Sequence, residues 1–209
     1  MKKFNIAVVI ALIVILFLGI YGLANKGKRS EVNVETLPLI SASETTDKYE
    51  PALTVEYTPL GVPNINASFK AWMSYKAVTN VSSPQYKFIH EWGWSDSEGF
   101  MRCCGEKDLG IEQDYYLIAL GSYYGTTIGT KYKITLDTGR VFYGALADSK
   151  SDNHTNSTNQ YNPHNGNMVE FLVDTSKLNS DVKRMGSANV YMPLNGYITK
   201  IERMDFVLD

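Results

Sequence analysis

The feature that most constrains this chain of 209 residues is an uninterrupted apolar segment at its N-terminus. No charged side chain occurs from Ile6 to Ala24, and Lys2 and Lys3 precede the segment. At 1.5 Å per residue, 19 residues approach the ~30 Å thickness of the hydrocarbon layer of a membrane. Residues 1–25 are therefore predicted to be a signal anchor. A cleaved signal peptide is the alternative, because the small residues Gly22 and Ala24 would suit a cleavage site.

Either form of this segment predicts export of the rest of the chain. With an uncleaved anchor, the protein is expected in the cell membrane as a single-pass protein, with its domain on the extracytoplasmic side. With cleavage, it is expected to be secreted. The membrane itself is thus an expected partner, through the N-terminal helix.

The charge of the remaining chain argues against nucleic acid as a ligand. Five of the 20 basic residues lie in residues 1–29, so 15 remain against 22 acidic residues, a balance of about −7. A nucleic-acid-binding domain needs a basic surface to neutralise phosphates. Nucleic acid is therefore excluded as a predicted partner.

Two segments follow the apolar N-terminus. Residues 26–65 are rich in Ser, Thr, Glu, Pro and Lys and lack a sustained period, which is typical of a disordered tether. Residues 66–209 are expected to form one domain, large enough to bury a core without disulfides. The adjacent Cys103 and Cys104 do not have the spacing of a metal site or of an unstrained disulfide, and are interpreted as small semi-buried side chains.

The pattern of residues 66–209 is mainly that of strands. Strands are predicted over 115–120, 131–136, 140–147, 168–173, 189–192 and 197–206, with a turn at 137–139 that makes a hairpin of the second and third. Residues 69–77 fit either a helix or a strand. Ser83-Pro84 predicts the start of a short helix. Residues 174–176 are expected to cap a second helix, which ends at Gly186. Residues 148–167 are expected to be a long polar loop.

Several of these stretches, in this order, resemble the three-aspartate domain of bacterial cell-wall proteins. The matching stretches are Ala119-Leu120, Ile128–Tyr132, Ala147-Asp148 and Val169–Asp174, followed by the helix that ends at Gly186. The domain occurs in lytic transglycosylases of the A type and in rare lipoprotein A. The resemblance implies a six-stranded double-psi β-barrel with one or two short helices. The chain departs from the pattern at Gly121, where the family has its first aspartate, and at Ser149–Ser151, where it has T-G-G.

The resemblance also implies a site. The family's third aspartate, the proton donor to the glycosidic oxygen in lytic relatives, corresponds to Glu170, and the second corresponds to Asp148. A raised pKa suits a carboxyl group to this chemistry, and a second carboxylate can raise it. His154 is a candidate to tune the acid by a hydrogen bond, and Asp152 is the other catalytic candidate in the loop.

Further candidates come from side-chain chemistry. Tyr123 and Tyr124 are candidates to stack on sugar rings, and Lys150 and Thr130 are candidates for polar contacts with a glycan. Asp152 and His154 leave a metal-dependent hydrolase open as an alternative function. No metal and no cofactor is expected.

The leading expectation is a protein that acts on the cell wall and cleaves the glycan strands of peptidoglycan with a carboxylate acid. An alternative function of a different class has the same fold but no catalytic activity. It is a module that binds peptidoglycan or another envelope glycan, or that serves envelope assembly.

Overall fold

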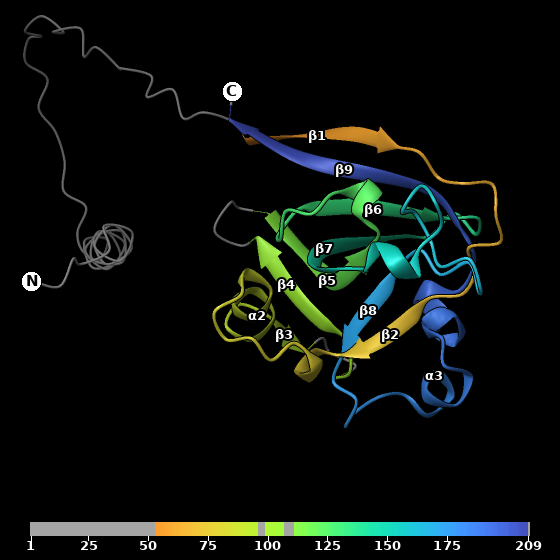
Figure 1. Cartoon of the computed structure of the whole chain (residues 1–209). Helices are drawn as coiled ribbons and strands as arrows, with labels where there is room; N and C mark the ends of the chain where they lie inside the picture. The colour runs from red at the N-terminus through yellow and green to blue at the C-terminus, as the bar shows by residue number, and fades with distance from the viewer. Residues whose placement is uncertain (1–52, 96–98, 107–110, 209) are drawn as a thin grey trace, which may run out of the picture. The chain divides into compact units, whose positions relative to one another are not determined.

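The chain is mainly β, as its alternating patterns predict (Figure 1). The structure, a computed structural model, describes residues 53–95, 99–106 and 111–208. Within these residues lie nine strands: β1 Leu53–Leu60, β2 Ala71–Ser74, β3 Trp94–Ser95, β4 Arg102–Glu106, β5 Ile111–Leu120, β6 Lys131–Leu136, β7 Val141–Ser149, β8 Glu170–Val173 and β9 Ile198–Leu208. The same part of the chain has two short α-helices: α2 Pro84–His90 and α3 Ser180–Met185.

The strands form one mixed sheet rather than the six-stranded closed barrel expected. Hydrogen-bonded neighbours run in the order β1-β9-β6-β7-β5-β4-β3. The long strand β5 also pairs with β8, and β8 pairs in turn with β2. Two pairs, β5–β7 and β2–β8, are parallel. Across the described ranges this order does not close into a ring, because β1 and β3 have one partner each.

The predicted hairpin is confirmed as β6 and β7. Ile134 pairs with Phe142, and Leu136 accepts a hydrogen bond of 2.9 Å from the amide of Gly139. Gly139 has a φ of +77°, which an L side chain adopts only with strain. The turn chemistry of residues 137–139 therefore determines the register of this pair.

Both helices are where the sequence predicts them, but one cap differs. Ser83 caps α2 by accepting a hydrogen bond from the amide of Tyr86, and Pro84 is the first helical residue. Helix α3 ends at Gly186, whose φ of 66° is left-handed. Its N-cap is Asn179, not the predicted 174–176, because Asp174 forms a turn of its own with Ser176.

The boundary predicted between tether and domain is wrong, because a strand begins at Leu53. Strand β1 pairs along its whole length with β9, from Leu53 opposite Leu208 to Leu60 opposite Ile201. Pro59 obscured this strand in the sequence. Proline is tolerated here because β1 is an edge strand. The predicted apolar helix and the rest of the tether before residue 53 lie outside the described residues.

Two shorter predictions are resolved or corrected. The ambiguous residues 69–77 form β2 and a single 3₁₀ turn, Tyr75–Ala77. The strand expected over 189–192 is replaced by two 3₁₀ turns, Ala188–Val190 and Met192–Leu194. Pro193 lies within the second turn, where its fixed φ suits a helical start and its missing amide would weaken a strand.

The core lies on both faces of β5. Ile118 and Leu120 pack in one cluster of buried side chains, whereas Tyr115 and Leu117 pack in a second. Cys103 and Cys104 are both buried, one in each cluster. Among the described residues, no helix is long and apolar enough to cross a membrane.

Candidate functional site

Two carboxylates flank one small residue at the end of β5. Ala119 pairs with Asp148 of β7 on one side and with Glu170 of β8 on the other. Glu170 pairs further with Ala71 of β2. Directly paired residues point to the same face of a sheet, and neighbouring strands lie about 4.8 Å apart, so the two acidic residues stand roughly 10 Å apart at the backbone. Because Ala119 and Ala71 have short side chains, they leave space beside the two carboxyl groups.

A β-bulge puts Asp148 on this face. The pairing of β5 with β7 shifts between Ile118, opposite Leu146, and Ala119, opposite Asp148. The extra residue on β7 is Ala147, which is fully buried. Because side chains alternate along a strand, a regular register would put Ala147 opposite Ala119 and turn Asp148 to the other face.

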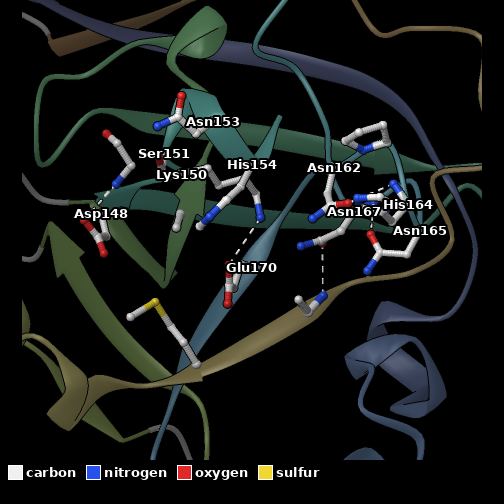
Figure 2. A pocket seen from close by; sticks show the side chains of 15 residues that line it. Asp148, Lys150, Ser151, Asn153, His154, Asn162, His164, Asn165, Asn167 and Glu170 are labelled. Carbon is white, nitrogen blue, oxygen red and sulfur yellow. Dashed lines mark hydrogen bonds and ion pairs between the residues drawn. The ribbon is translucent and has the colours of Figure 1, made fainter. Parts of the chain in front are cut away.

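These residues open into a pocket of about 450 Å³. The loop 150–167 contributes most of the lining, and the ends of β2, β5, β7 and β8 contribute the rest (Figure 2). Figure 2 shows Glu170 between Asp148 on one side and the side chains of Asn162, His164, Asn165 and Asn167 on the other. The lining residues are Ala71, Met73, Ala119, Asp148, Ser149, Lys150, Ser151, Asn153, His154, Asn162, Pro163, His164, Asn165, Asn167 and Glu170.

Lys150 gives one of the two carboxylates a counter-charge. Its Nζ lies 3.3 Å from Oε2 of Glu170, with exposed side-chain fractions of 7% for Lys150 and 27% for Glu170. The Lys150 amide donates to the carbonyl of Leu120 at 2.9 Å, which extends the pairing of β7 with β5 by one residue. Burial lowers the pKa of Lys150, and the carboxylate of Glu170 opposes that shift.

Asp148 has a different environment. Burial raises the pKa of Asp148, and the negative charge of Glu170 adds to this shift. The amide of Ser149 donates to Oδ1 of Asp148 at 2.9 Å, which opposes the increase. Relative to water, the site thus favours the protonated form of Asp148.

The polar loop is held to the sheet by Asn167, a residue that the sequence analysis did not single out. This asparagine is buried, and its Oδ1 accepts a hydrogen bond of 3.1 Å from the amide of Ala71. Asn165 and Asn162 accept bonds from amides two residues further on, at Asn167 and His164. The density of Asn in the loop was the available signal, because Asn side chains form such turns.

The structure brings some of the predicted loop residues to the pocket. His154 and His164 both line it and are exposed. Within the described residues His154 makes no hydrogen bond with either carboxylate, contrary to the expected tuning contact. Asp152 is also exposed, but it lies outside the lining and accepts a hydrogen bond of 2.7 Å from Ser122 Oγ.

The predicted glycan contacts other than Lys150 lie away from the pocket. Tyr124 is buried and donates its hydroxyl to the carbonyl of Gly61 at 3.1 Å, so its ring is not available for stacking. Tyr123 is 47% exposed and packs edge-on against Tyr124. Thr130 donates to the carbonyl of Thr127 at 2.8 Å and serves its own turn.

Gly121 lies at a position where the polar loop leaves no room for a side chain. A Cβ atom built on Gly121 would overlap the carbonyl oxygen of Asn159. The same carbonyl accepts a hydrogen bond of 3.3 Å from the amide of Tyr123. The backbone of the polar loop therefore occupies the space that a side chain at this position would need.

The described residues offer no cluster of three or more His, Cys, Asp or Glu side chains that could hold a metal ion.

No family model, curated protein or solved structure matches this chain.

Proposed function

We propose that this protein acts on the glycan strands of peptidoglycan, with the pocket beside Ala119 as its active site. The single observation that carries the proposal is the placement of Asp148 and Glu170 on either side of Ala119, facing one open pocket. Cleavage of a glycosidic bond needs one carboxyl group that donates a proton and one carboxylate that stabilises or accepts charge. Burial raises the pKa of Asp148, whereas Glu170 has Lys150 as a counter-charge, and this difference suits the two roles.

The environments of the two carboxyl groups favour Asp148 as the proton donor, whereas the resemblance implies Glu170 in that role. Asp148, which has the raised pKa, donates its proton to the glycosidic oxygen as the bond from C1 to that oxygen breaks. Glu170, whose carboxylate pairs with Lys150, accepts the proton of the hydroxyl group that attacks C1. Attack by a hydroxyl of the same sugar closes an anhydro ring, and attack by water gives a reducing end.

A second candidate function is glycan binding without cleavage. The ion pair with Lys150 occupies one oxygen of Glu170, an arrangement that also suits a site that only binds. In that case the asparagines and histidines of the loop provide hydrogen bonds to a glycan, and no bond is cleaved. A metal-dependent hydrolase has less support, because the described residues offer no cluster of three or more His, Cys, Asp or Glu side chains.

We further propose an ancestry, a connectivity and a location for this protein. A distant relation to the three-aspartate domain is supported by the order in which Asp148 and Glu170 occur on two strands beside β5. A double-psi connection is supported by the parallel pairs β5–β7 and β2–β8. An extracytoplasmic location, with or without a membrane anchor, is supported by the apolar segment from Ile6 to Ala24.

The test is digestion of purified peptidoglycan by the full-length chain in detergent, with mass analysis of the released muropeptides. Asp148→Asn and Glu170→Gln are compared with Asp152→Asn, which removes an exposed carboxylate outside the pocket. We expect anhydromuropeptides or reducing muropeptides from the parent and from Asp152→Asn, and a loss of about 100-fold or more in the two pocket variants.

Two other outcomes decide between the candidates. Co-sedimentation with peptidoglycan without release, weakened by the pocket variants, would establish the binding function. Release that is equal in all four proteins would refute the assignment of the site.

A further inference from the structure

A second pocket, of about 430 Å³, lies along β5, and its lining shares no residue with the pocket of the carboxylate pair. Its central row is formed by Trp94 of β3, Cys103 of β4 and Tyr116 of β5, which pair in that order. Tyr116 and Ala119 are three residues apart on β5, so their side chains point to opposite faces of the strand. The second pocket is thus separate from the proposed active site.

The row presents an aromatic ring beside a carboxylate. A Cβ atom built on Gly105 would lie 2.9 Å from Cη2 of Trp94, so the indole lies against the backbone of Gly105. The same Cβ position is 3.7 Å from Oδ1 of Asp114, which pairs with Gly105. Trp94 is 37% exposed, and Asp114 is exposed beside it.

More aromatic and amide side chains complete the lining. Tyr191 is partly exposed and lines the same pocket, and Gln113 adds an amide. The described side chains that line the pocket include Asp114 but no Lys, Arg or His. The carboxylate of Asp114 repels anionic ligands such as phosphates, and together with the aromatic rings it suits a neutral molecule that is rich in hydroxyl groups.

We propose that this pocket binds a neutral pyranose oligosaccharide, with Trp94 as the ring on which one sugar stacks and Asp114 as the acceptor of its hydroxyl groups. The C–H bonds on one face of a pyranose are slightly positive and suit the negative face of an indole. A carboxylate within reach of the same sugar accepts hydrogen bonds that are stronger than those of a neutral acceptor. The site would hold glycan without cleaving it, and it does not depend on the proposed active site.

The test uses the three tryptophans of the chain as reporters. The full-length chain, with ¹⁵N-labelled tryptophan in detergent micelles, is titrated with chitotetraose, and the three indole N–H signals are followed. We expect a saturable shift of the Trp94 signal. Trp72, whose indole donates to the carbonyl of Val182, and Trp92, which is 65% exposed in a different pocket, should not move.

Variants separate this site from the other surfaces. Asp114→Asn keeps the shape of the side chain and should weaken the binding of chitotetraose by about tenfold, as expected for the loss of a charged acceptor. Trp94→Ala should abolish the binding, and Trp92→Ala should not alter it. In the Asp148→Asn, Glu170→Gln double variant the shift of Trp94 should persist, even if the proposed cleavage is lost.

Three results would overturn the inference. One is a Trp94 signal that does not move with chitotetraose, cellotetraose or maltotetraose. Another is an equal shift of Trp92, which would indicate non-specific contact with exposed indoles. The third is loss of the Trp94 shift in the double variant, which would place the sugar in the first pocket.

Discussion

The ammonium nitrogen of Lys150 lies 3.3 Å from Oε2 of Glu170, inside a pocket that also contains Asp148. This contact gives Glu170 a counter-charge, while Asp148 lies across Ala119 with a hydrogen bond from the amide of Ser149. The two carboxyl groups of the pocket therefore differ in charge environment although they pair with the same residue.

Removal of the Glu170 carboxylate should affect Lys150 measurably. In Glu170→Gln the pKa of Lys150 should fall further below its ordinary value, because the carboxylate that opposes the effect of burial is gone. The variant should lose about 1–3 kcal/mol of unfolding free energy, since the ammonium is left without its counter-charge. NMR titration of the lysine Cε and urea unfolding measure the two effects. Asp152→Asn is the control, and an equal loss in both variants would contradict the role of the ion pair.

Asp148→Asn should increase stability at neutral pH. The folded-state pKa of Asp148 is raised by burial and by Glu170, so the folded protein binds more protons than the unfolded chain just above the ordinary value of 3.8. Its contribution to stability is therefore complete below that value and is lost as the pH rises through the folded-state pKa. Urea unfolding between pH 4 and pH 8 should show a shallower fall in the variant than in the parent. Identical slopes would show that Asp148 has no raised pKa.

Lys70 should produce a pH dependence of the opposite sign. The side chain is fully buried and donates to the carbonyls of Ser68 and Gly196 and to Asn189 Oδ1. Burial lowers the pKa of Lys70 from 10.5 to about 8, against a smaller effect of Asp137. The unfolded chain then binds more protons between these values, so stability should rise with pH from about 8 to 10.5, by roughly 3 kcal/mol at most.

Lys70→Met tests this expectation. The variant should lose the rise in unfolding free energy across that range and should be less stable near pH 7, because three acceptors lose their donor. A rise that persists in Lys70→Met would assign the pH dependence to other groups.

Gly121→Ala should destabilise the protein through the polar loop. The new methyl group would overlap the carbonyl oxygen of Asn159, a backbone atom that cannot move without the loop. We expect a loss of about 2–4 kcal/mol, in the range of severe steric changes. Gly139→Ala is the matched control. A Cβ there meets nothing within 4 Å, so only the positive φ is penalised, by about 1 kcal/mol. A smaller loss for Gly121→Ala than for Gly139→Ala in thermal unfolding would refute the argument.

The local chemistry of short segments was sufficient to predict several elements. Ser83 and Pro84 begin α2, Gly186 ends α3, and the turn at 137–139 joins β6 to β7. Each of these features depends on residues that are neighbours in the chain, so its conformational preference is set locally, although its stability comes from tertiary packing.

The site itself depended on contacts between distant segments. The strand β1 was missed because its stability comes from β9, about 150 residues further along the chain. The buried position of Tyr124 depends on Gly61, and the burial of Asn167 depends on β2. No local pattern distinguishes these residues from exposed ones of the same type.

The sequence by itself determined a mainly β chain with two short helices, and its resemblance to the three-aspartate domain drew attention to Asp148 and Glu170. Only the tertiary structure decided that the bulge at Ala147 turns Asp148 toward Ala119, that Lys150 pairs with Glu170, and that β1 belongs to the sheet. The physical reason is the period of two along a strand. A shift of one residue in the pairing moves a side chain to the other face, and this pairing is determined by the packing of strands that are far apart in the chain.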